Sequence, residues 1–263
     1  MRADRRPLSA MATTMVVAGV AVLLVGCVSG SAQRPESSNA ENAAEFNMQL
    51  GIAYLRQGNL PLAQEKLTRA LEQNPRDPNV HTALGLLNDR LDRPREADEH
   101  YRAALRLAPR DPDVLNNYAV YLCKRGRYDE GVKRFEEVAN NRLYRAPEAA
   151  YTNAGVCNQS AQRFDEAERL YRRALTVRPN YAEAVLQLGN LMLQLGRNDE
   201  AKAEVDRYLA NFTATPELLF LGVRASRVTG DIRAEERFAR RLKVDFPDSA
   251  PARALATLPR NPG

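Results

Sequence analysis

The sequence predicts an all-α fold: a superhelix of six helix-turn-helix repeats after a signal peptide and a flexible tether. Small residues recur at separations of 34, 34, 36, 34 and 33 positions, at Gly51, Gly85, Ala119, Gly155, Gly189 and Gly222. Twelve positions after each comes another small residue, at Ala63, Ala97, Gly131, Ala167, Ala201 and Ala234. Four positions later comes a bulky apolar residue, at Leu67, Tyr101, Phe135, Tyr171, Val205 and Phe238. Because these columns keep phase over roughly 200 residues, stacked copies of one unit are favoured over a plain helical bundle.

Each unit is predicted to be two antiparallel helices. Its halves carry apolar residues at helical spacing, as in Leu84, Leu87 and Leu91 and then Ala97 and Tyr101. Turn residues separate the halves, at Gly58-Asn59, Asp92-Arg93-Pro94, Gly126-Arg127, Gln162-Arg163, Gly196-Arg197 and Gly230-Asp231. Prolines stop several second helices, at Pro75, Pro109, Pro179 and Pro247.

The unit resembles the tetratricopeptide repeat, a helix-turn-helix of about 34 residues. Six repeats are expected within residues 43–248, at about 44–77, 78–111, 112–147, 148–181, 182–214 and 215–248. The third has Gly131 and Val138 where alanine is usual, and two extra residues. The fifth has Val205 and Tyr208 and lacks the closing proline. Local irregularity is therefore expected at both joints.

Residues 1–26 are expected to be a lipoprotein signal peptide. Arg2, Arg5 and Arg6 precede the apolar stretch 11–25, which is too short to span a bilayer comfortably. The sequence Leu24-Val25-Gly26-Cys27 that follows resembles the bacterial lipobox, which implies cleavage before Cys27 and lipid attachment to it. The alternative is a secretory signal with an incidental cysteine.

The region after the lipobox is expected to tether the repeats to a membrane. Residue 28 is valine, not the aspartate that retains enteric lipoproteins in the inner membrane, so that resemblance implies outer-membrane delivery with the repeats in the periplasm. Residues 27–42 are polar without an apolar period, which is typical of a flexible tether. Residues 249–263 are expected to form a last helical turn and a disordered tail.

Composition argues against catalysis and nucleic-acid binding. Without residues 1–26, 35 basic residues remain against 32 acidic ones, and arginines are interleaved with Glu and Asp on the predicted second helices. The two histidines, His81 and His100, lack a partner pattern for a metal or a nucleophile. We therefore expect no enzyme activity, cofactor, metal, nucleic acid or small-molecule substrate.

Two cysteines remain after the lipobox, Cys123 and Cys157, in the first helices of adjacent repeats. First helices stacked about 8 to 10 Å apart bring facing sulfurs within bonding range, and export places them in an oxidising compartment. The sequence therefore favours a disulfide over two small core residues.

In such a superhelix the first helices line the concave face, and unit positions 2, 5, 9, 12 and 13 point into it. A lining that mixes apolar and amide side chains suits an extended or helical peptide. Some of these apolar residues are instead expected to seal one repeat against the next. The predicted groove consists of Met48, Ile52, Leu55, Leu86, Arg90, Asn116, Val120, Lys124, Thr152, Val156, Gln159, Leu186, Asn190 and Leu193.

Residues 116–168 also resemble the type IV pilus biogenesis lipoproteins of the PilF/PilW family. The resemblance rests on Asn117-Tyr118 with Leu122-Cys123, the inserted Asn141-Arg142-Leu143-Tyr144, and Asn153-Ala154-Gly155 with Cys157. It implies a pilotin, an outer-membrane lipoprotein that helps the pilus secretin reach the outer membrane and multimerise. The alternatives are another periplasmic repeat lipoprotein, for example in outer-membrane β-barrel assembly, and, more weakly, a peptidoglycan hydrolase.

Overall fold

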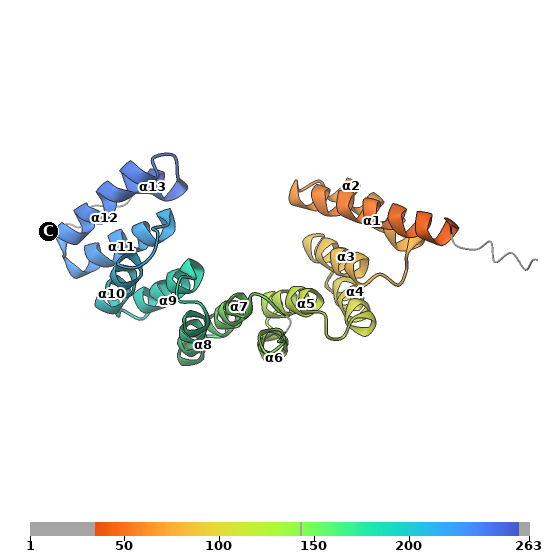
Figure 1. Cartoon of the computed structure of the whole chain (residues 1–263), viewed down its shortest axis with the longest axis horizontal. Helices are drawn as coiled ribbons and strands as arrows, with labels where there is room; N and C mark the ends of the chain where they lie inside the picture. Colours follow the sequence, from red (N-terminus) through yellow and green to blue (C-terminus); the bar gives the residue numbers. More distant parts are fainter. Residues whose placement is uncertain (1–34, 143, 258–263) are drawn as a thin grey trace, which may run out of the picture.

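The structure, a computed structural model, describes residues 35–142 and 144–257. Within these ranges every regular element is an α-helix, and the helices follow one another along an open arc (Figure 1). Their bounds are α1 (Pro35–Arg56), α2 (Leu60–Gln73), α3 (Pro78–Arg90), α4 (Pro94–Leu107), α5 (Pro112–Lys124), α6 (Tyr128–Ala139), α7 (Pro147–Ser160), α8 (Phe164–Val177), α9 (Ala182–Gln194), α10 (Asn198–Leu209), α11 (Pro216–Thr229), α12 (Ile232–Asp245) and α13 (Ala250–Ala254).

The odd-numbered helices from α1 to α11 are the first helices of the six repeats, and each packs on the even-numbered helix that follows it. Each odd-numbered helix also packs on the next odd-numbered helix, whereas the backbones of successive even-numbered helices in the described part of the chain lie farther apart. Long side chains bridge some of these gaps, as in the ion pair between Arg172 of α8 and Glu204 of α10. The arc therefore curves toward the odd-numbered side. Figure 1 shows α3, α5, α7 and α9 along its inner edge and α4, α6, α8 and α10 outside.

The turn inside each repeat requires one residue in the left-handed conformation. Glycine fills this position in four repeats, with φ between 70° and 77°, at Gly58, Gly126, Gly196 and Gly230. Asp92 and Gln162 adopt the same conformation in the other two repeats, with φ of 54° and 59°. All six lie in the turns predicted from the sequence. A side chain in this conformation costs free energy that glycine avoids.

The column of small residues allows each first helix to approach its second helix closely. A β-carbon at Gly85 would lie 2.9 Å from the ring of Tyr101, and one at Gly155 would lie 2.5 Å from the ring of Tyr171. Both distances are too short for ordinary packing. The period of small and bulky residues thus reflects direct contact within each repeat.

In the fifth repeat a different residue packs against the small residue of the first helix. Val205 replaces the larger residue of the column, and the space above Gly189 is filled by Leu221 of α11, whose side chain would overlap a β-carbon there. α10 ends at Leu209, and α11 begins only at Pro216. The third repeat also has a long joint, from the end of α6 at Ala139 to Pro147. Irregularity thus occurs at both joints where the sequence predicts it.

Both ends of the stack carry helical residues beyond the six repeats. α1 begins at Pro35, so residues 35–42, which the sequence assigned to the tether, are helical. Proline fits the first turn of a helix because its missing N–H has no partner there in any case. At the other end α13 packs on α11 and α12, in the place of the next first helix. The expected last helical turn is therefore present.

Candidate partner-binding groove

The concave face carries one apolar side chain per repeat along four consecutive repeats. These residues, named the apolar stripe, are Ile52, Leu86, Val120 and Val156. Val120 is 49% exposed and Val156 is 39% exposed, whereas Ile52 and Leu86 are half-buried. Large apolar residues exposed in a row offer a contact surface to a partner. The stripe ends at the fifth repeat, where Asn190 takes the equivalent position.

Three predicted groove residues are buried and do not line the concave surface. Met48 is 7%, Leu55 1% and Thr152 2% exposed. Met48 and Leu55 pack into the core shared by the first two repeats, and the Thr152 hydroxyl donates a hydrogen bond to the Glu148 carbonyl of its own helix at 2.8 Å. Neighbouring helices cover these positions, so they seal repeat against repeat.

Leu186 and Leu193 of α9 are partly buried against the core of the last two repeats. They contribute less free surface than the two exposed valines. The concave surface available to a partner is thus concentrated on the first four repeats, around α1, α3, α5 and α7.

The amide side chains of the groove bond from one first helix to the next. The Asn153 amide donates to Asn116 at 3.3 Å, across α7 and α5. Gln159 of α7 donates to Gln194 of α9 at 2.8 Å, and Arg224 of α11 donates to Asn190 at 3.0 Å. Because an amide has two donors and an acceptor with two lone pairs, each retains capacity for a ligand. These bonds hold the amides in fixed positions before any partner arrives.

A charged cluster lies over the seam between α3 and α5. The buried Asp89 carboxylate accepts from Lys124 Nζ at 2.6 Å and from the Arg125 guanidinium at 2.7 Å. Arg90 lies over the preceding seam, where it donates to the Leu55 carbonyl at 2.9 Å. Lys124 and Arg90 are both exposed. The groove therefore carries cations beside its apolar stripe.

A disulfide joins α5 to α7 beneath the exposed valines. Cys123 and Cys157 are bonded, and their Cα atoms lie 5.5 Å apart. Cys123 is three residues beyond Val120, and Cys157 is next to Val156. The covalent link spans the long joint of the third repeat and ties the two helices that carry the exposed part of the stripe.

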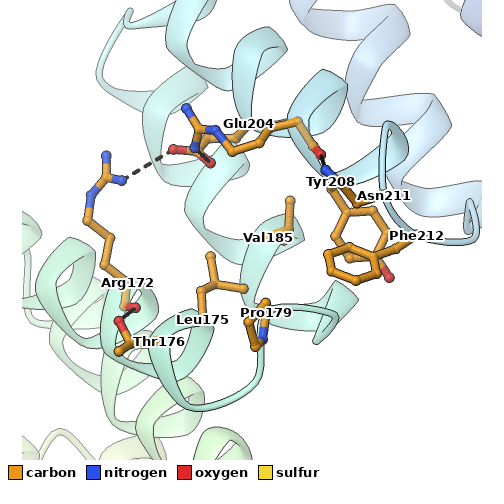
Figure 2. Close-up of a pocket in the computed structure, with 10 residues that line it drawn as sticks. Arg172, Leu175, Thr176, Pro179, Val185, Glu204, Tyr208, Asn211 and Phe212 are labelled. Atoms are coloured by element: carbon orange, nitrogen blue, oxygen red, sulfur yellow. Dashed lines mark hydrogen bonds and ion pairs between the residues drawn. The ribbon is translucent and has the colours of Figure 1, made fainter.

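A separate pocket of about 690 Å³ opens on the convex side between α8 and α10. Figure 2 shows Leu175 and Val185 near the centre of the pocket and the rings of Tyr208 and Phe212 at the right, overlapping in this view. The centroids of these two rings are 5.2 Å apart. The other end holds the buried Glu204 carboxylate, which pairs with Arg172 at 3.2 Å and with Arg207. Sequence reasoning missed this pocket because it forms where α10 ends early and Phe212 folds back from the following loop.

Family models support the repeat architecture. Three models described as tetratricopeptide repeats match residues 48–112, 112–180 and 159–219. The chain belongs to the tetratricopeptide-repeat family. The expected fold class is thus confirmed.

Among curated tetratricopeptide-repeat proteins, the chain is similar to the type IV pilus assembly protein PilF of Pseudomonas aeruginosa. The two are 28% identical over 232 residues, which cover 88% of this chain and 92% of PilF. An uncharacterized protein of Haemophilus influenzae is 31% identical over 139 residues, or 53% of this chain and 76% of that protein.

Solved structures of two type IV pilus proteins superpose on this chain. The structure of Pseudomonas aeruginosa PilF superposes with a TM-score of 0.62 at 26% identity, covering 83% of this chain and 99% of PilF. The structure of PilW, a widely conserved type IV pilus biogenesis factor, has a TM-score of 0.63 at 23% identity, covering 81% of this chain and 98% of PilW. PilW thus shares the fold, and the resemblance to the PilF/PilW proteins is confirmed.

The tetratricopeptide fold brings together the two histidines, which the sequence placed at unrelated positions. His81 of α3 and His100 of α4 lie with their Nδ1 atoms 3.1 Å apart, and His81 Nε2 lies 3.1 Å from the Pro75 carbonyl. Burial, and secondarily the neighbouring His81, lower the pKa of His100. The described residues contain no group of three or more side chains able to bind a metal.

Cys27, the predicted lipidation site, lies outside the described residues. None of the described helices combines the length and apolar character that crossing a bilayer requires.

Proposed function

We propose that this protein is an outer-membrane lipoprotein that acts as a pilotin for the secretin of the type IV pilus. The lipid on Cys27 holds the repeats at the periplasmic face of the outer membrane. The concave groove binds a segment of the secretin and promotes its localisation and multimerisation. The protein works as a scaffold without catalysis, cofactor, nucleic acid or small-molecule substrate.

The observation that carries this proposal is the similarity to PilF over nearly the whole of both chains. A match confined to a few repeats would point only to the repeat fold, because tetratricopeptide repeats serve many functions. Here the repeats match PilF from end to end, in sequence and in structure.

The surface that we propose for the secretin is the apolar stripe on α1, α3, α5 and α7. Its exposed valines can bury apolar area against a partner at roughly 25 cal/mol per Å². The amides that flank it are fixed by bonds between neighbouring helices, which lowers the ordering cost of binding. A backbone segment laid along the arc would find both apolar contacts and hydrogen-bond partners.

Charge substitution in the stripe tests this role. Val120→Glu and Val156→Glu each place a carboxylate at an apolar contact, so secretin multimers should fall sharply in cells that carry either variant. Because both valines are exposed, 49% and 39%, the helical circular dichroism and melting temperature should change little. Val177→Glu is the matched control, since Val177 is 47% exposed at the end of the second helix α8.

Normal secretin multimers in both folded groove variants would place the binding surface elsewhere, with the convex pocket between α8 and α10 as the next surface. Normal multimers after deletion of the gene would favour a different periplasmic adaptor role.

The anchor is tested separately. Cys27→Ser should release the protein from the outer-membrane fraction, because an unlipidated chain would lack the acyl chains that hold it there at about 0.8 kcal/mol per buried CH₂. Continued flotation of this variant with outer membranes would contradict the lipid assignment.

A further inference from the structure

The concave face carries a second column that runs parallel to the apolar stripe. A cation follows each of the first three stripe residues by four positions, at Arg56, Arg90 and Lys124. Residues four apart lie on the same face of a helix, and their Cα atoms are about 6 Å apart along its axis. All three cations are exposed. The fourth and fifth repeats have the neutral residues Ser160 and Gln194 in their place.

The contacts of two of these cations place them over the seams between first helices. The Arg90 guanidinium reaches back from α3 to the Leu55 carbonyl at the end of α1, at 2.9 Å. Lys124 reaches back from α5 to Asp89 of α3, at 2.6 Å. Successive first helices meet along the inside of the arc, so these contacts lie on the concave surface.

The two leading cations keep their charge available. Arg90 bonds to a neutral carbonyl, and within the described residues no carboxylate pairs with Arg90 or Arg56. Lys124 differs, because it shares the carboxylate of Asp89 with Arg125. The cations of this column that no carboxylate neutralises therefore lie in the first two repeats, beside Ile52 and Leu86.

On the opposite side of the column of stripe positions, the first, third and fifth repeats carry a carboxylate, whereas the second repeat has Asn79. Glu45, Asp113 and Glu183 are exposed and occupy the second position of their repeats. Each lies seven positions before the stripe position of its helix, or about 10 Å along the helix axis. In the first and third repeats the groove thus passes across its width from a carboxylate, over the apolar stripe, to a cation.

We infer that the partner segment seated on the first three repeats has an apolar face bordered on one side by acidic side chains. When the apolar side chains of the segment lie on the stripe, the carboxylates along that side lie beside Arg56, Arg90 and Lys124. If the segment bound in the opposite orientation, its carboxylates would lie beside the carboxylates of the groove. Complementary charge of this kind sets the orientation and choice of a partner more than its total affinity. The inference rests on the proposed function, because it describes the segment that the same groove would bind.

Selection from a random peptide library displayed on phage tests the inference, with the purified protein as bait. The wild-type protein should enrich peptides in which Asp or Glu lies beside apolar residues. The double variant Arg56→Glu/Arg90→Glu should lose this enrichment or shift it toward Lys and Arg. An enriched acidic peptide should bind the variant about tenfold more weakly, the size expected for two exposed charge pairs.

The double variant Arg69→Glu/Arg240→Glu is the matched control. It makes the same change in net charge at exposed positions of the second helices α2 and α12. It should enrich the same acidic peptides as the wild-type protein. An equal shift in the control would mean that net charge, not the groove, selects the peptides, and would overturn the inference.

Other results would also overturn it: no enriched peptides, enrichment of neutral or basic peptides by the wild-type protein, or the same peptides from the Arg56→Glu/Arg90→Glu variant. If the Arg56→Glu/Arg90→Glu variant selects the same peptides while Val120→Glu and Val156→Glu abolish secretin multimers, the proposed function is supported and the acidic preference is refuted. If acidic peptides are selected but both valine variants support normal multimers, the acidic preference stands and the secretin role falls.

Discussion

Gly131 of α6 lies against Cys123 of α5 so closely that a β-carbon at residue 131 would overlap the Cys123 sulfur. All five other repeats have alanine in this column, at Ala63, Ala97, Ala167, Ala201 and Ala234. The exception in the third repeat is therefore tied to the disulfide, because the sulfur occupies the space that an alanine methyl group would need.

Gly131→Ala should therefore lower the free energy of unfolding, by about 1 to 3 kcal/mol for an overpacked contact. Urea denaturation of the non-reduced protein measures the change. In a Cys123→Ala/Cys157→Ala background the same substitution should cost less than about 1 kcal/mol, since the nearest remaining atom is the Ala119 carbonyl oxygen at 3.1 Å. An equal effect in both backgrounds would show that the sulfur is not the cause.

The disulfide itself should stabilise the stack. It closes a loop across a sequence separation of 34 residues, which is worth about 3 to 4 kcal/mol in the chain-entropy model. Adding a reductant should lower the urea midpoint of the wild-type protein but not of the Cys123→Ala/Cys157→Ala variant. Mass spectrometry of the non-reduced protein that finds both thiols free would refute the pairing.

The two non-glycine turns offer a gain in stability. Asp92 and Gln162 adopt positive φ, a conformation that costs a residue with a side chain about 1 to 2 kcal/mol. Replacing either residue with glycine removes this cost, but part of the gain is lost because glycine loses more chain entropy on folding. Gln162→Gly should therefore raise the free energy of unfolding by about 0.5 to 1 kcal/mol. Asp92→Gly should raise the free energy of unfolding by less, because it removes the hydrogen bond that Asp92 accepts from Arg125 at 3.3 Å.

Thermal or urea unfolding measures both variants. Gly126→Ala, which imposes the strained conformation on a turn that now has glycine, should lower stability. A Gln162→Gly variant less stable than the wild type would mean that the glutamine side chain makes a favourable contribution that outweighs the strain.

His100 makes stability depend on pH. Burial lowers the pKa of His100, so the unfolded chain takes up its proton more readily than the folded chain. Stability from this group is therefore complete above the ordinary histidine pKa of about 6.5 and decreases as the pH falls through that value, levelling off below the folded-state pKa.

Urea midpoints at pH 8 and pH 5.5 test this sign. The difference between the two midpoints should be smaller in His100→Gln than in the wild-type protein, because the variant has no proton to take up at this position. A wild-type protein that becomes more stable on acidification relative to His100→Gln would contradict the expected direction.

Much of the architecture follows from local patterns in the sequence. The spacing of Gly85 and Tyr101 recurs in other repeats because it records a contact made within one repeat, and turn residues such as Gly126 mark a local backbone conformation. The exposed positions of Val120 and Val156 follow from helical periodicity in the same way. The irregular joints were also visible, as the inserted residues of the third repeat and the missing proline of the fifth.

Other features arise only when helices pack on one another, within a repeat or between repeats. Whether a concave position is exposed depends on the rotation of the neighbouring helix, so Leu55 and Thr152 are buried although Val120 and Val156, also at groove positions, are not. Leu221 fills the space left by Val205 from a different repeat, and His81 meets His100 across a helix pair. A periodic pattern assigns each residue a face of its own helix, but contacts between helices depend on side-chain volumes and offsets that the period does not contain.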